Sequence, residues 1–127
     1  MASTNAIEFE GKTLHDRGIK AASVFLERRG YEILETAWTC DAGTIDVIAK
    51  DEEDTIVFVE VNVFDVAENG MPDDEVSPDK RRRLEVIAGS YLSKSDAIDV
   101  TVRFDILSML VIGNDRALLR HHLNVFG

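Results

Sequence analysis

The feature that most constrains the fold is a pair of apolar stretches joined by a short acidic turn. Residues 43–50 read GTIDVIAK and residues 55–64 read TIVFVEVNVF, with DEED between them. Both stretches are rich in Val, Ile and Phe, which favours strands, and both are apolar at most positions rather than only at alternate ones. Strands with this composition are buried on both faces. The pair therefore predicts a central part of a sheet that is covered on both sides.

Two helices are expected, one before the strand pair and one after it. The first covers residues 12–29 and ends at Gly30, after a loose lead-in over residues 1–10. The second opens the segment SPDKRRRLEVIAGSYLSK, where Ser77 suits the N-cap and Pro78 suits the first helical position. These helices supply the layers that the strand pair needs.

Three further strands are expected, at residues 31–39, about 100–112 and 116–125. The order helix, three strands, helix, two strands predicts an α/β sandwich with a central mixed β-sheet flanked by helices. The chain has 127 residues, and no repeat or linker divides it. We therefore expect a single domain over residues 1–127.

Charge and composition limit the classes of function. The net charge is −10, from 24 acidic and 14 basic residues, which argues against tight non-specific binding to nucleic acid. No apolar run approaches the roughly 18 residues that span a bilayer, and the first residues do not resemble a signal peptide. A lone cysteine excludes an internal disulfide. We expect a cytoplasmic protein with no membrane part.

Two acidic residues interrupt the apolar strand pair. If the turn is centred on Glu53, Asp46 lies directly opposite Glu60 and the two side chains share a face. Facing carboxylates in a partly dry cleft repel each other, and a divalent cation removes the repulsion. Oxygen ligands suit Mg²⁺ or Mn²⁺, which can activate water at a phosphodiester. The pair is therefore a candidate metal site.

The same register makes the opposite face wholly apolar. Its members are Ile45, Val47, Ala49, Val57, Val59 and Val61. A register shifted by one residue would separate the two carboxylates, and the sequence leaves that alternative open. A structural role is also open, in which both acids lie near strand ends and bind Arg, Lys or backbone N–H groups.

An ordered set of short motifs resembles a known family. The segments are HDRGIKAASVFLERRGYEIL, GTIDVIA, VFVEVNVF, SPDKRRRLEVIAGSYL, RFDIL and LNVF, in that order. Over about residues 13–127 they are similar to the YraN-like proteins, small bacterial relatives of archaeal Holliday-junction resolvases in the restriction-endonuclease-like superfamily. The resemblance implies a restriction-endonuclease-like sandwich and a nuclease-type site.

The resemblance also implies roles for individual residues. Asp46 and Glu60 would be the metal carboxylates for Mg²⁺ or Mn²⁺, with the backbone carbonyl of Val61 as a further ligand. The family's catalytic lysine, two residues after the glutamate, is Asn62 here, which carries no positive charge and cannot act as a base near neutral pH. Three other charged positions of the family pattern are also uncharged in this chain: Ile19, Thr44 and Phe64. The expected metal binding is weak or absent.

The dense basic run at the start of the second helix is a candidate nucleic-acid contact. It consists of Lys80, Arg81, Arg82 and Arg83. Lys80 lies one turn before Leu84, on the core side, from where it could reach Asp46 and Glu60. The alternative is an ordinary solvated helix start. The histidines at 15, 121 and 122 are expected to be structural.

Three functions remain open on these residues. The leading hypothesis is a nuclease-fold protein linked to nucleic acid binding, whose metal-dependent phosphodiesterase site is degraded. Branched or single-stranded DNA would then bind weakly, partly because residues 65–79 are strongly acidic. The alternative is an active, Mg²⁺- or Mn²⁺-dependent, structure-specific endonuclease. A third hypothesis is a protein-interaction module on the same fold, and each hypothesis leaves room for a protein partner or a homodimer.

Overall fold

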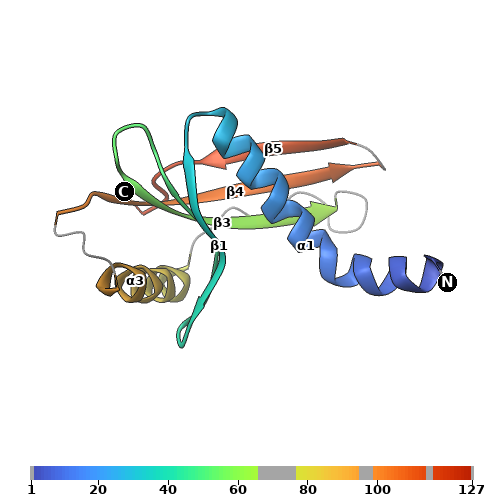
Figure 1. Ribbon diagram of the computed structural model, residues 1–127, viewed down its shortest axis with the longest axis horizontal. Coiled ribbons are helices and arrows are strands. Elements are labelled where there is room, and N and C mark those ends of the chain that lie inside the picture. Colours follow the sequence, from blue (N-terminus) through green and yellow to red (C-terminus); the bar gives the residue numbers. More distant parts are fainter. Residues whose placement is uncertain (1, 66–76, 95–98, 114–115, 127) are drawn as a thin grey trace.

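Among the residues that the structure describes, two helices and five strands form the fold (Figure 1). The computed structural model describes the backbone of residues 2–65, 77–94, 99–113 and 116–126, with side chains from residue 14 onward. The elements are α1 (Ala2–Arg28), β1 (Glu32–Cys40), β2 (Gly43–Lys50), β3 (Ile56–Asp65), α3 (Pro78–Ser93), β4 (Val102–Ile112) and β5 (Arg116–His122). The predicted order of elements is confirmed.

The strands form one mixed sheet in the order β1-β2-β3-β4-β5. Neighbouring strands are antiparallel except β3 and β4, which are parallel. Parallel neighbours need a crossover connection, and the chain between β3 and β4 passes through α3. The strand pair of the sequence thus lies inside the sheet, with β1 on one side of it and β4 on the other.

The sheet carries an apolar cluster on each face, so the protein is the α/β sandwich that the sequence predicts. On one face Ile19, Ala22 and Leu26 of α1 pack against alternate residues of the central strands, Val57 and Val59 among them. On the other face Leu84, Ile87 and Ala88 of α3 pack against Ile48 and Phe58. Because the strands are buried on both faces, their continuous apolar composition has a direct structural cause.

The expected face of Ile45 is wrong. Its side chain belongs to the α3 cluster with Ile48, whereas Val47 belongs to the α1 cluster. Simple alternation would put residues 45 and 47 on one face, so the strand is irregular at Asp46. Ala37 lies across from Asp46 in β1 and has a positive φ of 49°. The residues on either side of Ala37 pair with the residues on either side of Asp46, but no pair is recorded between Ala37 and Asp46 themselves. The irregularity aims Asp46 differently from an ordinary strand residue.

The start of α1 also differs from the expectation. The helix begins at Ala2, so residues 2–10 are helical and do not form a loose lead-in. Alanine and glutamate in residues 2–10 favour helix locally, and Gly11 alone does not end it. The C-terminal end is as predicted, because Gly30 has a φ of 91° and Tyr31 N–H bonds back to the carbonyl of Leu26.

The second helix starts as its sequence predicts. Ser77 is the N-cap, its hydroxyl accepts a hydrogen bond from Lys80 N–H at 3.1 Å, and Pro78 opens the helix. Residues 66–76 of the acidic segment and residues 114–115, between the last two strands, lie outside the described residues. Within the described part of the chain, neither helix has the length and apolar character that a bilayer crossing requires.

A buried polar network around Asp105 connects the beginning of β4 to β5 and to the residues that follow β5. Asp105 is 1% exposed and accepts hydrogen bonds from Arg103, from His121 and from the backbone N–H of Asn124. Burial alone would raise the pKa of Asp105, but these hydrogen bonds outweigh it and hold the pKa below its usual value. The hydrogen bond to Asp105 in turn raises the pKa of Arg103, so this pair is ionised near neutral pH.

Candidate functional site

The register of the strand pair is the predicted one. β2 and β3 pair Val47 with Val59 and Ile48 with Phe58, so continuing the ladder by one pair sets Asp46 opposite Glu60. The recorded pairing stops at Val47, next to the irregularity in β2. Both carboxylates therefore lie on neighbouring strands where regular pairing ends. That they share one metal ion stays a prediction.

Asp46 is held from the α1 side and by the backbone of β3. Its Oδ1 lies 2.8 Å from Nε2 of His15 in α1, and its Oδ2 accepts a hydrogen bond from Val61 N–H at 2.7 Å. The carboxylate thus satisfies a strand N–H beyond the end of the recorded ladder. Val61, whose carbonyl was the implied metal ligand, is tied to Asp46 through its N–H.

Glu60 is held from the α3 side by two cations. Lys80 Nζ lies 2.7 Å from Glu60 Oε2, as an ion pair whose geometry falls short of a hydrogen bond, and Arg83 donates to Oε1 at 3.3 Å. The Glu60 side chain is 13% exposed, so water screens these contacts less than at an open surface. A β-carbon added at Gly43 would lie 3.6 Å from Arg83, so the guanidinium also covers the start of β2.

Three of the four positions where the resemblance implies charge have other surroundings. Ile19 is buried in the α1 cluster, where a carboxylate would be desolvated. The hydroxyl of Thr44 lies 3.0 Å from that of Thr39 across the β1–β2 hairpin. Asn62 is half-buried on β3, opposite Ser108 of β4, and within the described residues its amide has no hydrogen-bond partner. None of these side chains brings a charge to the site.

Each residue of the basic run has an acidic partner within the protein. Lys80 and Arg83 contact Glu60, as described above. Arg82 donates to Asp79 at 2.8 Å, and Arg81 lies 3.5 Å from Glu85 and over the ring of Phe126. The sequence left two alternatives for Lys80, a reach toward the two acids or a solvated helix start. In the structure Lys80 reaches Glu60.

Two side chains at the site were not assigned to it from the sequence, where His15 was expected to be structural and Arg83 was named only as part of the basic run. His15 lies four residues before Ile19, one helical turn away, so a search one turn along α1 would have found it. Arg83 lies three residues after Lys80, and that spacing puts both on one side of α3. His121 and His122 were expected to be structural, and His121 indeed bonds the buried Asp105.

The donor set fits a divalent metal poorly. The oxygens of Asp46 face an imidazole and a backbone N–H, and those of Glu60 face an ammonium and a guanidinium. An ion would have to displace these partners before it reached either carboxylate. In the described part of the chain, no cluster of three or more His, Cys, Asp or Glu side chains has the arrangement of a metal site.

Comparison with known proteins places the chain in a family. The model of the "Uncharacterised protein family UPF0102" matches residues 20–109. The chain belongs to this family. A UPF0102 protein of Geobacter sulfurreducens is 34% identical over 115 residues, covering 91% of this chain and 89% of the relative. A UPF0102 protein of Syntrophus aciditrophicus is 40% identical over 92 residues, covering 72% of each chain. The YraN-like resemblance is thereby confirmed.

The matched region of the UPF0102 family includes the candidate site except His15 and Ile19. It starts at residue 20 in α1 and ends at residue 109 in β4, so it contains both carboxylates and the basic run. A further UPF0102 protein, from Roseiflexus castenholzii, is 38% identical over 99 residues, covering 77% of this chain and 79% of the relative.

Proposed function

We propose that this protein is a nuclease-fold protein that binds nucleic acid weakly, and that its metal-dependent phosphodiesterase centre is impaired. The observation that supports this most is the pairing of Glu60 with Lys80 at 2.7 Å and with Arg83 at 3.3 Å. In a working centre of the implied kind, a divalent ion would balance the two carboxylates. Here Lys80 and Arg83 supply that balance for Glu60, and Asn62 supplies no charge.

The geometry gives the impairment a physical basis. The Lys80–Glu60 pair is mostly shielded from water, so breaking it would leave a carboxylate and an ammonium poorly solvated. A metal ion must meet that cost in addition to its own dehydration, which Mg²⁺ undergoes reluctantly. Mg²⁺ or Mn²⁺ would therefore bind weakly, if at all, at physiological concentrations.

Nucleic acid would contact the exposed part of the basic run. Arg81 and Arg82 are exposed, and their ion pairs with Glu85 and Asp79 are surface pairs, typically worth about 0–1 kcal/mol. A DNA phosphate can therefore compete for these guanidinium groups. The net charge of −10 keeps the affinity low and makes it fall steeply with added salt.

The experiment is fluorescence anisotropy with branched and single-stranded DNA over a range of salt, in EDTA and in Mg²⁺. We expect weak, salt-sensitive binding that EDTA leaves unchanged and that Arg81→Glu/Arg82→Glu abolishes. The control is Arg17→Glu/Lys20→Glu, which makes the same change of charge on the exposed side of α1. Equal loss in both double variants would show a general charge effect and would contradict the proposed interface.

An active endonuclease is the second candidate, and one observation favours it. Asn62 brings no positive charge to Glu60, but Lys80 does, so the site contains a lysine from another element. A plasmid and branched-DNA nicking assay with Mn²⁺ separates the candidates. Robust cleavage that is lost in Asp46→Ala, Glu60→Ala and Lys80→Met would favour the active enzyme. We expect no cleavage above background.

A further inference from the structure

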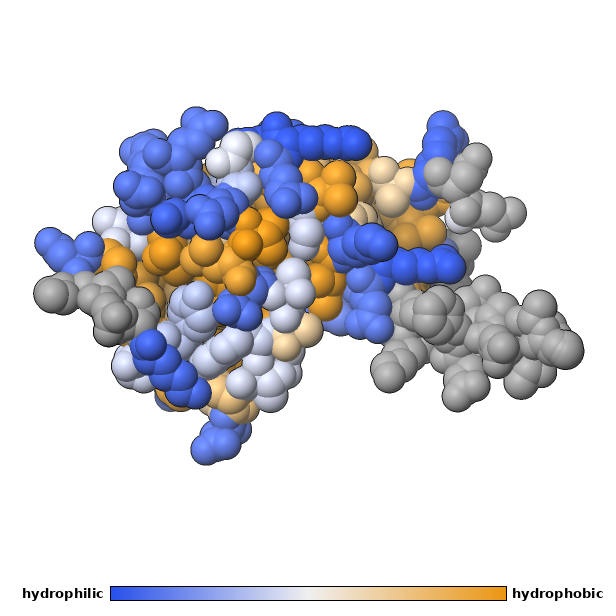
Figure 2. Space-filling model, in the orientation of Figure 1, coloured by the Kyte–Doolittle hydropathy of each residue, from blue (hydrophilic) through white to orange (hydrophobic). Residues whose placement is uncertain are grey.

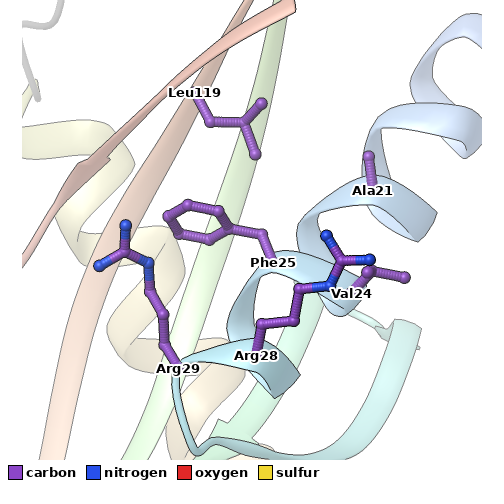
Figure 3. A pocket seen from close by; sticks show the side chains of 6 residues that line it. All are labelled: Ala21, Val24, Phe25, Arg28, Arg29 and Leu119. Carbon is purple, nitrogen blue, oxygen red and sulfur yellow. The ribbon is translucent and has the colours of Figure 1, made fainter.

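A groove lies between the second half of α1 and the edge strand β5 (Figure 3). Its volume is about 650 Å³. Phe25 extends from α1 toward Leu119 of β5, Val24 lies next to the end of the Arg28 side chain, and Arg28 and Arg29 flank the opening. Figure 2 shows hydrophobic residues at the surface in the region between α1 and β5, next to hydrophilic ones. The groove therefore combines an apolar floor with a cationic rim.

The rim arginines differ from those of the basic run in α3. Among the residues that the structure describes, Arg28 and Arg29 have no acidic side chain within ion-pair distance, whereas Lys80 to Arg83 all have one. The guanidinium of Arg29 lies 4.3 Å from the centre of the Phe25 ring. In a chain with a net charge of −10, this is a local positive surface that is open to an anionic partner.

The strand beside the groove has an open edge. β5 is last in the sheet order, and within the described residues it pairs only with β4. The outer edge of such a strand presents N–H and C=O groups that can pair with an added strand. β5 reads RALLRHH and contains no acidic residue, and Leu118 is 52% exposed. Its chemistry suits an extended segment that is acidic and partly apolar.

We propose that the groove and the β5 edge bind an extended acidic segment of a partner protein, in which apolar residues alternate with glutamate or aspartate. The segment would add a strand beside β5, place one apolar side chain between Phe25 and Leu119, and set carboxylates against Arg28 and Arg29. Main-chain hydrogen bonds would give affinity, and the groove would give specificity. This inference does not depend on the state of the phosphodiesterase site.

Two other occupants fit the groove less well. A second copy docking through the same edge would bring the basic β5 strands together, and like charges would repel. Nucleic acid would use aromatic faces for base stacking, but the Phe25 ring has Arg29 over it and the edge of His121 against it. An acidic peptide uses both the charge and the apolar floor.

The test measures fluorescence anisotropy of a labelled peptide of alternating glutamate and valine. We expect binding to the wild type, and a loss of about tenfold or more in Arg28→Glu/Arg29→Glu, since two charge contacts would become repulsive. The matched control is Arg81→Glu/Arg82→Glu, with the same change of charge on α3, and it should bind as the wild type does. Val24→Asp, at an exposed position on the groove, should also weaken binding, while thermal unfolding confirms that each variant folds.

A modified probe tests the strand addition separately. N-methylation of the alternate amides that face β5 removes main-chain donors from the peptide and should abolish binding. For a peptide that docks as a helix, the effect of N-methylation would not depend on which alternate set of amides is blocked. No binding of the peptide, or equal loss in both double variants, would overturn the proposal. If the affinity for single-stranded DNA fell only in Arg28→Glu/Arg29→Glu, the groove would be assigned to nucleic acid. If self-association were lost only in that variant, the groove would be assigned to a second copy. Either result would likewise overturn the proposal.

Discussion

Ile19 stands where the resemblance implies a glutamate, and its side chain is 8% exposed within the α1 cluster. We predict that Ile19→Glu destabilises the protein by about 2–4 kcal/mol, because it removes apolar packing and desolvates a carboxylate. Ile19→Leu keeps the volume and should cost less than about 1.5 kcal/mol. Urea unfolding of both variants checks the difference, and equal stability of Ile19→Glu and wild type would show that this position is open to water.

The burial of Ile19 also limits how the charged residues implied by the YraN-like resemblance can be restored. Restoring charge at residues 19, 44 and 62 together should give Mn²⁺-dependent nicking only if the protein still folds, and the burial of Ile19 opposes the folding of the triple variant. Asn62→Lys alone introduces its charge at a half-buried position without disturbing the α1 cluster. We expect it to give little activity by a nicking assay, since Glu60 remains paired with Lys80 and Arg83.

Asp105 contributes to the pH dependence of the free energy of unfolding. Its pKa is lowered in the folded state, so the stabilisation is fully present above the unfolded value of about 3.9 and is lost as the pH falls through the folded value. Asp105→Asn should cost about 3–5 kcal/mol at neutral pH, because Arg103 loses its buried partner. Urea unfolding between pH 7 and strong acid checks this. The gap between variant and wild type should shrink below about pH 4, and a gap that is constant with pH would contradict the assignment.

At the scale of elements, the contact of α1 with β3 depends on Gly18. A β-carbon at this position would lie 2.5 Å from Cγ2 of Val63, whose branched side chain is stiff. Gly18→Ala should therefore destabilise the protein by about 1–3 kcal/mol, although alanine favours helix. The control is Gly89→Ala in α3, where a β-carbon meets nothing within 4 Å, and we expect a gain of about 0.5–1 kcal/mol. Thermal unfolding compares them, and stabilisation by both would show that the helix can shift away from β3.

The sequence predicts the elements well because their signals are local. Continuous apolar strands indicated a sheet covered on both faces, and Ser77 and Gly30 marked helix ends through cap and turn chemistry. The irregularity at Asp46 was not predictable, because it depends on the conformation of Ala37 in the neighbouring strand. The partners of Glu60 depend on how α3 packs over the sheet. From the sequence, a contact of Lys80 with Glu60 was therefore only one of two alternatives for that lysine.

At the scale of the whole molecule, charge is distributed unevenly. The chain carries a net charge of −10, yet Glu60 of the candidate site and the four residues of the basic run are paired with opposite charges inside the protein. The cations left without acidic partners in the described residues include Arg28 and Arg29 at the α1–β5 groove. A weak nucleic-acid contact at α3 and a peptide contact at the groove would therefore use separate surfaces.

The central claim is that Lys80 and Arg83 hold Glu60 in place of a metal ion. Calorimetric titration of Mn²⁺ into the wild type and into Lys80→Met tests it most directly, with circular dichroism to confirm folding. We expect binding well weaker than micromolar in the wild type, and binding about tenfold tighter or more in Lys80→Met, because Glu60 then keeps only the longer contact to Arg83. Micromolar or tighter binding by the wild type, unchanged or weakened in Lys80→Met, would contradict it.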